Sequence, residues 1–387
     1  MEFNLILFAL IRSAVMGEAL SDKEKAMFSE NMLPELIRIS KMHDLAHLVS
    51  YGIMANNLIL PDNKYYTYLE QEQFAAVYRY EQINYDFEEL SSVLEKNAIP
   101  FLPLKGSVMR RYYREAWMRT SCDIDILIKP EDLQRATDIL INQCGYEKVT
   151  SSLHDISFKT PSKQNVELHH MLVEKGKAVK SNDILRSVWD RASLRDGFGY
   201  WYEMTDEMFF FYHIAHMAKH FEDGGCGIRP FIDLWILKKN EGCDEKSRNE
   251  LIQTAGLSKF MALSERMTEV WFEGRERDNI TSAMETFIIT GGTFGTTETH
   301  CLMKHHKSGG TVGYIIEHIF LPYGEMIYQY PILKEHKWLL PFMEVARWFR
   351  LVFLKEKKSV VEQIENNRDM YNSDETGIKL FLNEIGL

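Results

Sequence analysis

The sequence has few cysteines and no motif that pairs them. Five cysteines in 387 residues stand at wide spacings, and no Cys-x-x-Cys pair occurs. They are Cys122, Cys144, Cys226, Cys243 and Cys301. Disulfide frameworks and cysteine-rich zinc sites need paired, closely spaced thiols. We therefore expect reduced thiols in a cytoplasmic protein.

Long apolar runs and an excess of positive charge are also absent. No segment approaches the roughly 18 apolar residues that a membrane-spanning helix needs. The short apolar stretch near the N-terminus follows Glu2, has no basic region before it and is interrupted by Arg12, which predicts a buried helix rather than a signal peptide. Lys and Arg number 45 against 56 Asp and Glu, a net charge of −11, which argues against sequence-blind binding of long nucleic acid.

Apolar periodicity divides the chain into three segments. Residues 1–90 carry apolar side chains at i, i+3, i+4 and i+7, which predicts an N-terminal helical segment. Residues 91–178 alternate short strand-like runs with the helix-like runs GSVMRRYYREA and PEDLQRATDILINQC, which predicts a compact α+β domain, the candidate catalytic module. Residues 179–387 return to the helical period and form the larger C-terminal helical domain. The predicted fold class is α+β.

The segment LPLKGSVMRRYYREAWMRTSCDIDILI carries most of the functional information. Gly106 and Ser107 follow one apolar run, and Asp123 and Asp125 stand at i and i+2 inside another. On a strand the two aspartates would share one face, about 6.6 Å apart along the chain. The opposite face would point into the core with Ile124, Ile126 and Ile128. Paired carboxylates beside a turn that can hold phosphate suggest metal-assisted phosphoryl or nucleotidyl transfer.

This arrangement resembles the nucleotidyltransferase superfamily of DNA polymerase beta. Its signature is Gly-Ser or Gly-Gly, a short helix, Asp-x-Asp on a strand and a third acidic residue on a later strand. Within it, the chain looks most like an uncharacterised bacterial group with a Lys-Gly-Ser turn and Arg-x-x-x-Asp-Ile-Asp, here residues 105–107 and 119–125. The resemblance is sharp over residues 99–170 and looser downstream. It implies a small mixed-sheet domain between the N-terminal helices and the C-terminal helical domain.

The resemblance implies that three carboxylates bind metal and carry the catalysis. Asp123, Asp125 and Glu167 would bind one or two Mg²⁺ ions, whose preferred ligands are carboxylate and phosphate oxygens. Glu167 would be the base or a ligand of the second ion, and Asp155 and Glu174 are alternatives for its place. An Asp-x-Asp pair alone is common on solvated strand edges, so the assignment depends on the upstream Gly-Ser.

The same segment supplies candidates for nucleotide binding. Gly106 lets the backbone approach a phosphate and Ser107 adds a hydroxyl donor, although a plain helix cap would use the same residues. Lys105 and Arg119 are candidates for neutralising the nucleotide phosphates, with Arg119 at the position where the resembled group carries arginine. The other nearby arginines are expected to be mostly solvated.

A histidine stripe in the C-terminal half offers further candidates. His213, His216 and His220 share one helical face and Lys219 adjoins them. In the resembled group this helix packs beside the active site, which implies nucleotide or acceptor contacts for His216 and Lys219. Lining of a cleft by partly buried histidines is the alternative, and no ligand at supporting spacing favours a metal site there.

Arg229 and Asp233 form a second feature of the C-terminal half. They stand at i and i+4, so they are most simply an ion pair along one helix. A substrate role is the alternative reading.

These observations together predict a bacterial Mg²⁺-dependent nucleotidyltransferase. It would bind an NTP such as ATP and move its NMP to a small-molecule or protein acceptor, with long nucleic acid unlikely and no membrane association. The rival readings are a non-catalytic nucleotide-binding sensor and an antitoxin-like interaction protein on the same fold. An intact set of three carboxylates favours the enzyme.

Overall fold

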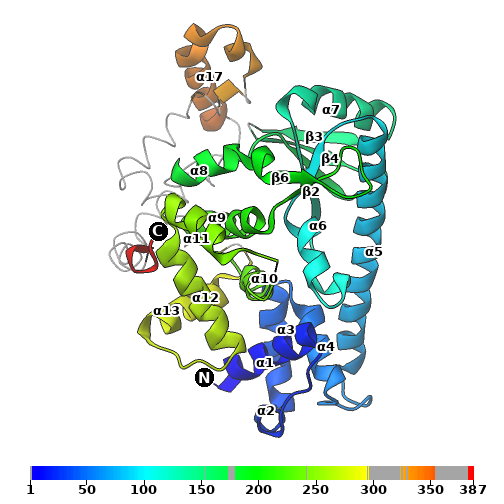
Figure 1. Ribbon diagram of the computed structural model, residues 1–387, viewed down its shortest axis with the longest axis vertical. Coiled ribbons are helices and arrows are strands. Elements are labelled where there is room, and N and C mark those ends of the chain that lie inside the picture. The colour runs from blue at the N-terminus through cyan, green and yellow to red at the C-terminus, as the bar shows by residue number, and fades with distance from the viewer. Residues whose placement is uncertain are drawn as a thin grey trace. The chain divides into compact units, whose positions relative to one another are not determined.

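The structure of the chain is a computed structural model (Figure 1). The chain divides into two compact units, Met1–Lys219 with Cys226–Thr293, and His220–Gly225 with Phe294–Leu387. All the predicted site residues lie in the first unit. The structure describes residues 2–152, 154–172, 179–240, 242–293, 295, 323, 326–327, 330–353 and 382–387.

The N-terminal segment is helical, as predicted. Its helices are α1 (Glu2–Met16), α2 (Asp22–Met27), α3 (Leu33–Met42), α4 (Ala46–Ala55) and α5 (Tyr66–Lys96), with a short 3-10 turn η1 (Glu30–Met32) before α3. The side chains of residues 6–11 in α1 are all buried, which confirms the prediction of a buried helix. The long helix α5 runs beside the sheet (Figure 1).

A five-stranded mixed sheet forms the centre of the α+β part. The strands are β1 (Phe101–Pro103), β2 (Asp123–Ile128), β3 (Glu147–Ser151), β4 (Asp155–Lys159) and β5 (Asn165–His169), in the order β1-β2-β5-β4-β3. Only β2 and β5 pair in parallel; the other three pairings are antiparallel. The mixed sheet and the α+β class are therefore as predicted.

One face of the sheet packs on two helices to form a core. Ile124, Ile126 and Ile128 of β2 lie in this core, as their alternation with the aspartates predicts. Helix α5 contributes Ile83, Phe87, Leu90 and Leu94, and α7 (Leu133–Asn142) contributes Ala136, Ile139 and Leu140. Because this face is apolar, a polar site can form only on the other face or at the strand ends.

The helix after the Gly-Ser turn is shorter than the run GSVMRRYYREA predicts. Helix α6 spans Lys105–Met109, a 3-10 turn η2 follows at Arg110–Tyr112, and Tyr113 is extended with φ −81° and ψ 151°. Tyr113 is buried and its hydroxyl donates to Asp233 at 2.7 Å. This tertiary contact accounts for the early end, because tertiary contacts override helix propensity. A second 3-10 turn, η3 (Ala116–Met118), leads to β2.

The C-terminal half of the first unit is helical after a small hairpin. The hairpin strands are β6 (Ala192–Leu194) and β7 (Tyr202–Met204). The helices are α8 (Val179–Arg186), α9 (Asp206–Asp223), α10 (Arg229–Leu237), α11 (Glu245–Ala255), α12 (Ser258–Phe272) and α13 (Asn279–Gly291). A 3-10 turn η5 (Val188–Arg191) lies before β6. Earlier in the chain, the 3-10 turn η4 (Pro130–Asp132) lies before α7.

The described part of the second unit is also helical. It contains η6 (Pro331–Lys334), η7 (Lys337–Leu339) and α17 (Leu340–Phe353). No helix among the described residues is both long and apolar enough to cross a bilayer. The helices before and after the sheet are those expected from the sequence, while the boundaries at residues 90 and 178 stay a prediction.

Candidate active site

The two strands that carry the predicted carboxylates lie side by side. β2 and β5 pair in parallel, and the register places Asp125 opposite Glu167 and Asp123 opposite Asn165. Side chains at paired positions point to the same face of a sheet. Asp125 is only 3% exposed, whereas the side chain of Glu167 is 33% exposed. The sheet therefore brings one deeply buried and one accessible carboxylate together.

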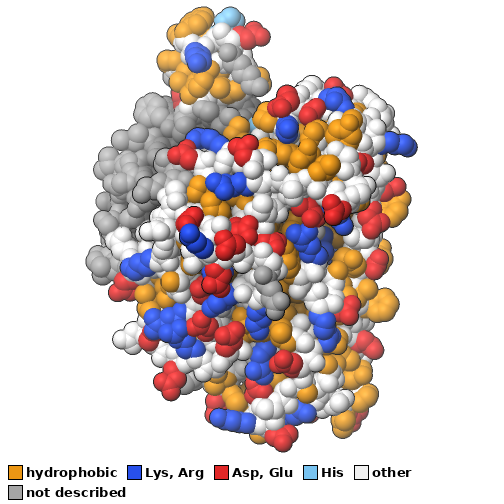
Figure 2. All heavy atoms as spheres, in the orientation of Figure 1, with side chains coloured by type: hydrophobic (Ala, Val, Ile, Leu, Met, Phe, Trp, Pro, Cys, Tyr) orange, Lys and Arg blue, Asp and Glu red, His pale blue; other side chains and the backbone are white. Residues whose placement is uncertain are grey.

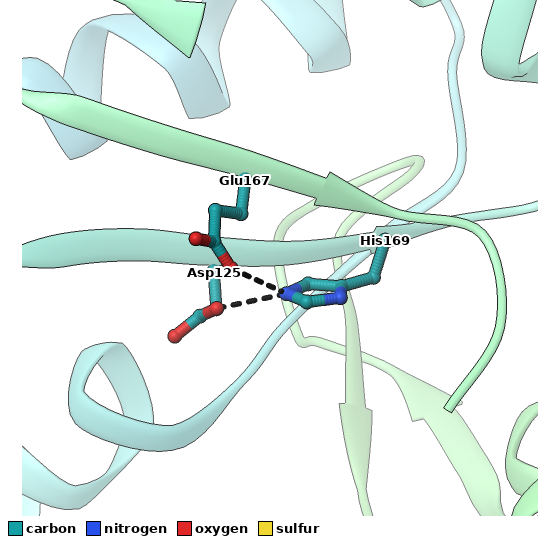
Figure 3. A group of neighbouring side chains, drawn as sticks. All are labelled: Asp125, Glu167 and His169. Atoms are coloured by element: carbon teal, nitrogen blue, oxygen red, sulfur yellow. Dashed lines mark hydrogen bonds and ion pairs between the residues drawn. The ribbon is translucent and has the colours of Figure 1, made fainter. Parts of the chain in front are cut away.

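A histidine joins these two carboxylates. His169 Nε2 lies 2.8 Å from Asp125 Oδ1 and 3.4 Å from Glu167 Oε2 (Figure 3). One ligand atom of each residue falls within 4.8 Å of the others. Asp123, which the sequence assigned to the metal set, is outside this group of three. The i, i+2 spacing of Glu167 and His169 was the signal in the sequence that could have identified His169.

Lys105 contacts the same buried carboxylate from the Gly-Ser turn. Its backbone φ is +43°, a left-handed conformation that is uncommon outside glycine, and its Nζ lies 3.1 Å from Asp125 Oδ1. The next residue, Gly106, packs closely, since a Cβ there would lie 3.1 Å from Ser121 Cβ. The turn is thus shaped to bring an ammonium group onto the strand that carries the aspartates.

Ser107 has a hydroxyl without a partner. Its Oγ is buried and bonds to none of the residues that the structure describes, while its backbone N–H donates to Leu104 O at 3.2 Å. Buried polar atoms are normally hydrogen-bonded, so an orphaned hydroxyl has free capacity for a ligand.

Arg119 is held by an aspartate from the C-terminal half. Its Nε donates to Asp233 Oδ1 and Oδ2 at 2.8 and 3.0 Å, and the pair is almost fully buried. Arg229 instead pairs with Asp44. The expected helix pair between Arg229 and Asp233 is therefore wrong, because each residue finds a tertiary partner of opposite charge. Arg119 still lies close enough to Asp123 for their charges to interact.

Arg110 is a buried guanidinium of a different kind. It is 6% exposed, and its hydrogen bonds go to Ser121 Oγ and to Arg119 O. No carboxylate within the described part of the chain forms an ion pair with it. Burial and the neighbouring charge of Arg119 lower its pKa to about 10. Nothing in the sequence pattern distinguishes this arginine from its neighbours.

Comparison with known proteins agrees with this geometry. A family described as uncharacterised nucleotidyltransferase matches residues 29–273, more than half of the chain. The chain belongs to this family. The solved structure of the antibiotic-resistance factor ANT(2'')-Ia is similar over 51% of this chain and 91% of its own, with 8% identity and a TM-score of 0.27. Similarity of that degree says nothing about activity. No curated protein matches the chain.

Of the alternatives for the third acidic position, Asp155 lies next to the site, because the register places it opposite His169. Asp155 is on β4, where its carboxylate accepts hydrogen bonds from the hydroxyls of Ser152 and Ser157. Glu174 lies outside the described residues. Glu167 is the acidic residue in the cluster with Asp125.

Helix α9, which carries the predicted histidine stripe, reaches the site through Tyr212, a residue outside that stripe. Tyr212 is close enough to Lys105 for the two groups to interact electrostatically. His213 is partly buried and its Nε2 lies 2.8 Å from Pro230 O, while His216 packs against Tyr212 with ring centroids 6.0 Å apart. Lys219 lies further along the same helix. α9 therefore approaches the site through Tyr212, with His216 beside it.

The two aspartates on β2 differ in their electrostatic surroundings. Burial, followed by the negative charge of Asp125, raises the pKa of Asp123 to about 6. Burial also opposes the ionisation of Asp125, but Lys105 and then His169 outweigh it and lower the pKa of that carboxyl. Burial acts to lower the pKa of His169, but the hydrogen bonds to Asp125 and Glu167 outweigh burial and raise the pKa to about 9. Asp125 is thus ionised and Asp123 is poised to lose its proton near neutral pH.

The arrangement can hold a divalent cation. Both contacts to Asp125, from Lys105 and His169, are to Oδ1, and Oδ2 has no hydrogen bond among the described residues. This Oδ2, beside Glu167 and Asp123, fits an ion that takes oxygen ligands, as Mg²⁺ does. The imidazole of His169 would also suit Mn²⁺ or Zn²⁺.

Proposed function

We propose that the protein is a Mg²⁺-dependent nucleotidyltransferase that moves an NMP from an NTP to an acceptor. The observation that carries the proposal is the pairing of Asp125 and Glu167 across parallel strands, beside a turn that delivers Lys105 to the same oxygen. Such a carboxylate group beside a phosphate-binding turn suits metal-assisted transfer.

Asp123, Asp125 and Glu167 are the proposed catalytic and metal-binding residues. A bound divalent ion supplies stabilisation of negative charge on the α-phosphate and the leaving pyrophosphate. The acceptor oxygen forms the new bond to the α-phosphorus as the bond to pyrophosphate breaks, and its proton passes to a base. Glu167 is the proposed base, because its side chain is 33% exposed where Asp125 is 3% exposed.

Lys105 and His169 are proposed to position Asp125. Both bond to its Oδ1 and leave Oδ2 for the cation. Lys105 would in addition meet the nucleotide phosphates, because its side chain remains 28% exposed. This pre-arrangement fixes the buried carboxylate before substrate binds, which is what electrostatic preorganisation requires.

The turn and the buried arginine are proposed to bind the triphosphate. Gly106 allows the close approach of the backbone, and Ser107 has a hydroxyl with free bonding capacity. Arg110 adds a positive charge that forms no ion pair with a carboxylate among the described residues, so an anion would compensate it. Arg119 is committed to Asp233 and would act on the phosphates through its field.

The acceptor side is proposed to involve α9. His216 and Lys219 lie on this helix beyond Tyr212, which reaches Lys105. A small molecule or a protein is the proposed acceptor, in the cytoplasm. Acidic and basic side chains are interspersed over the face in Figure 2, and the net charge is −11. Long nucleic acid would need a concentrated basic surface.

The test is transfer of label from α-³²P NTPs with Mg²⁺ and an extract of the source cells. Wild type should move label into a product whose mobility identifies the acceptor class. The Asp123→Asn/Asp125→Asn double variant should be inactive, while the exposed control Asp138→Asn, on α7, should retain full transfer. Equal transfer by wild type and the double variant would overturn the proposal.

The same experiment separates the rival functions. Binding of Mg²⁺-NTP without transfer would favour a nucleotide sensor. Absence of nucleotide binding, with co-purification of a defined protein, would favour an antitoxin-like partner. Binding is therefore measured beside turnover, with the double variant as the reference in both.

A further inference from the structure

A small pocket lies beside the edge strand of the sheet. It has a volume of about 140 Å³ and is lined by Pro103 from β1, Val108 from α6 and Met204 from β7, among others. Pro103 pairs with Ile126, and paired positions share a face of the sheet. Ile126 points into the core, so the pocket borders the sheet face opposite to that of Asp125. The pocket therefore lies apart from the carboxylate cluster, although Ser107 of the Gly-Ser turn is one of its lining residues.

The walls and the volume of the pocket suit one ring. Phe87, Trp201 and Phe209 contribute aromatic walls, and Val108 and Met204 add aliphatic surface. An apolar cavity of roughly 150 Å³ is known to bind benzene. The volume of about 140 Å³ is thus enough for a single six-membered ring and too small for a nucleotide.

The charged residues that line the pocket are two arginines and one glutamate. Arg111 Nη1 lies 2.9 Å and Arg195 Nη1 lies 3.7 Å from the same oxygen, Glu203 Oε1. The guanidinium of Arg195 also lies over the ring of Trp201, 4.4 Å from its centroid, which restricts its movement. Two cations share one carboxylate, so one positive charge is left for a ligand. Both arginine side chains are accessible, at 40% and 43% exposure.

We propose that this pocket binds a small aromatic carboxylate. The ring would occupy the aromatic walls, and the carboxylate would bond to Arg111 and Arg195, because guanidinium groups match the two oxygens of a carboxylate. The proposal does not depend on the transfer reaction, since neither metal nor nucleotide takes part in the binding.

Benzoate is the probe, and binding to the full chain is measured by calorimetry or by NMR. Wild type should bind benzoate saturably at one site. Benzyl alcohol keeps the ring without the charge and acetate keeps the charge without the ring, so each should bind roughly tenfold more weakly or worse. Equal binding of benzyl alcohol would overturn the charge argument, and equal binding of acetate would overturn the ring argument.

Variants test the same assignment with opposite expected signs. Arg111→Gln and Arg195→Gln should each weaken benzoate binding roughly tenfold. Glu203→Gln should strengthen it, because the competing carboxylate is removed; a purely structural role of Glu203 would not do so. Val108→Phe should fill the pocket and abolish binding, with near-UV circular dichroism confirming that the variant is folded.

Two controls locate the site. Arg186→Gln removes an exposed arginine on α8 that pairs with Asp183 and should leave benzoate binding unchanged. Asp125→Asn should also leave it unchanged, because the pocket borders the opposite face of the sheet. Loss of benzoate binding in Asp125→Asn, or weaker binding in Glu203→Gln, would overturn the proposal.

Discussion

Two buried aspartates in the same unit have very different surroundings. Asp233 is 1% exposed and both of its oxygens are bonded, by Arg119 and by the hydroxyl of Tyr113. Asp125 is 3% exposed, and both of its partners, Lys105 and His169, bond to Oδ1. Both oxygens of Asp233 are therefore bonded, whereas Oδ2 of Asp125 has no hydrogen bond among the residues that the structure describes.

The difference separates a structural anchor from a binding group. A buried carboxylate with complete hydrogen bonding gives its neighbours a fixed geometry. A buried carboxylate with unused capacity is destabilising unless something else fills it, which points to a ligand. Burial and charge alone would have ranked these two residues together.

The largest expected effect is the loss of activity on substitution of Asp125. Asp125→Asn should reduce nucleotidyl transfer by roughly 10²–10⁴-fold, since one oxygen ligand and the charge that orients the cation are lost. The melting temperature should change by only a few degrees. Steady-state transfer assays and thermal unfolding measure the two effects. If the Asp125→Asn variant lost much of its stability while the folded protein kept its specific activity, the roles given to the two aspartates would be reversed.

Substitution of Asp233, whose two oxygens are both bonded, should affect stability rather than activity. Asp233→Ala leaves Arg119 buried without its counter-charge, so the free energy of unfolding should fall by roughly 3–5 kcal/mol. Tyr113→Phe removes only one hydrogen bond to the same oxygen and should lower it by about 1 kcal/mol. Urea unfolding of both variants gives the comparison. Equal losses would mean that the ion pair with Arg119 contributes little.

A pair of arginines sharpens the same contrast. Arg110→Gln should raise the KM for NTP roughly tenfold, because the variant lacks a cation with free capacity for phosphate. Its free energy of unfolding should change little, as no ion pair is broken. Arg119→Gln should instead lower the free energy of unfolding. Steady-state kinetics and urea unfolding of both variants test this, and a reversed pattern would assign the phosphate role to Arg119.

The last expected effect is a dependence of stability on pH from Asp123. Its pKa is raised from 3.8 to about 6 by burial and by Asp125, so folding favours the protonated form. Stability from this group is present below about pH 4 and is lost as pH rises through 6. In EDTA, Asp123→Asn should therefore be more stable than wild type at pH 7.5, by about 1–3 kcal/mol, and no more stable at pH 4. Thermal unfolding at both pH values measures it; the same difference at both would exclude this cause.

The alternation in DIDILI was sufficient to predict one side of the site. The positions of Ile124 and Ile126 in the core follow from a period of two, and so does the shared face of the aspartates. The turn before them, with Gly106, was also visible in the sequence. These features are local, so a sequence contains them directly.

The missed partners are long-range contacts. His169 reaches Asp125 only because β5 pairs in parallel with β2, and 44 residues separate the two. Asp233 lies 114 residues from Arg119. No periodicity encodes such pairings; they follow from the packing of whole elements. The early end of α6 has the same origin, in the bond from Tyr113 to Asp233.

The register of β2 against β5 has a consequence for how the chain can misfold. A slip of one residue would turn Asp125 toward the apolar helices and an isoleucine toward the solvent. The error would be costly in the core as well as in the site, so a slipped chain would lose stability together with function. The alternation of aspartate and isoleucine thus couples the two requirements, because a chain that packs its core in the correct register has also aligned its carboxylates.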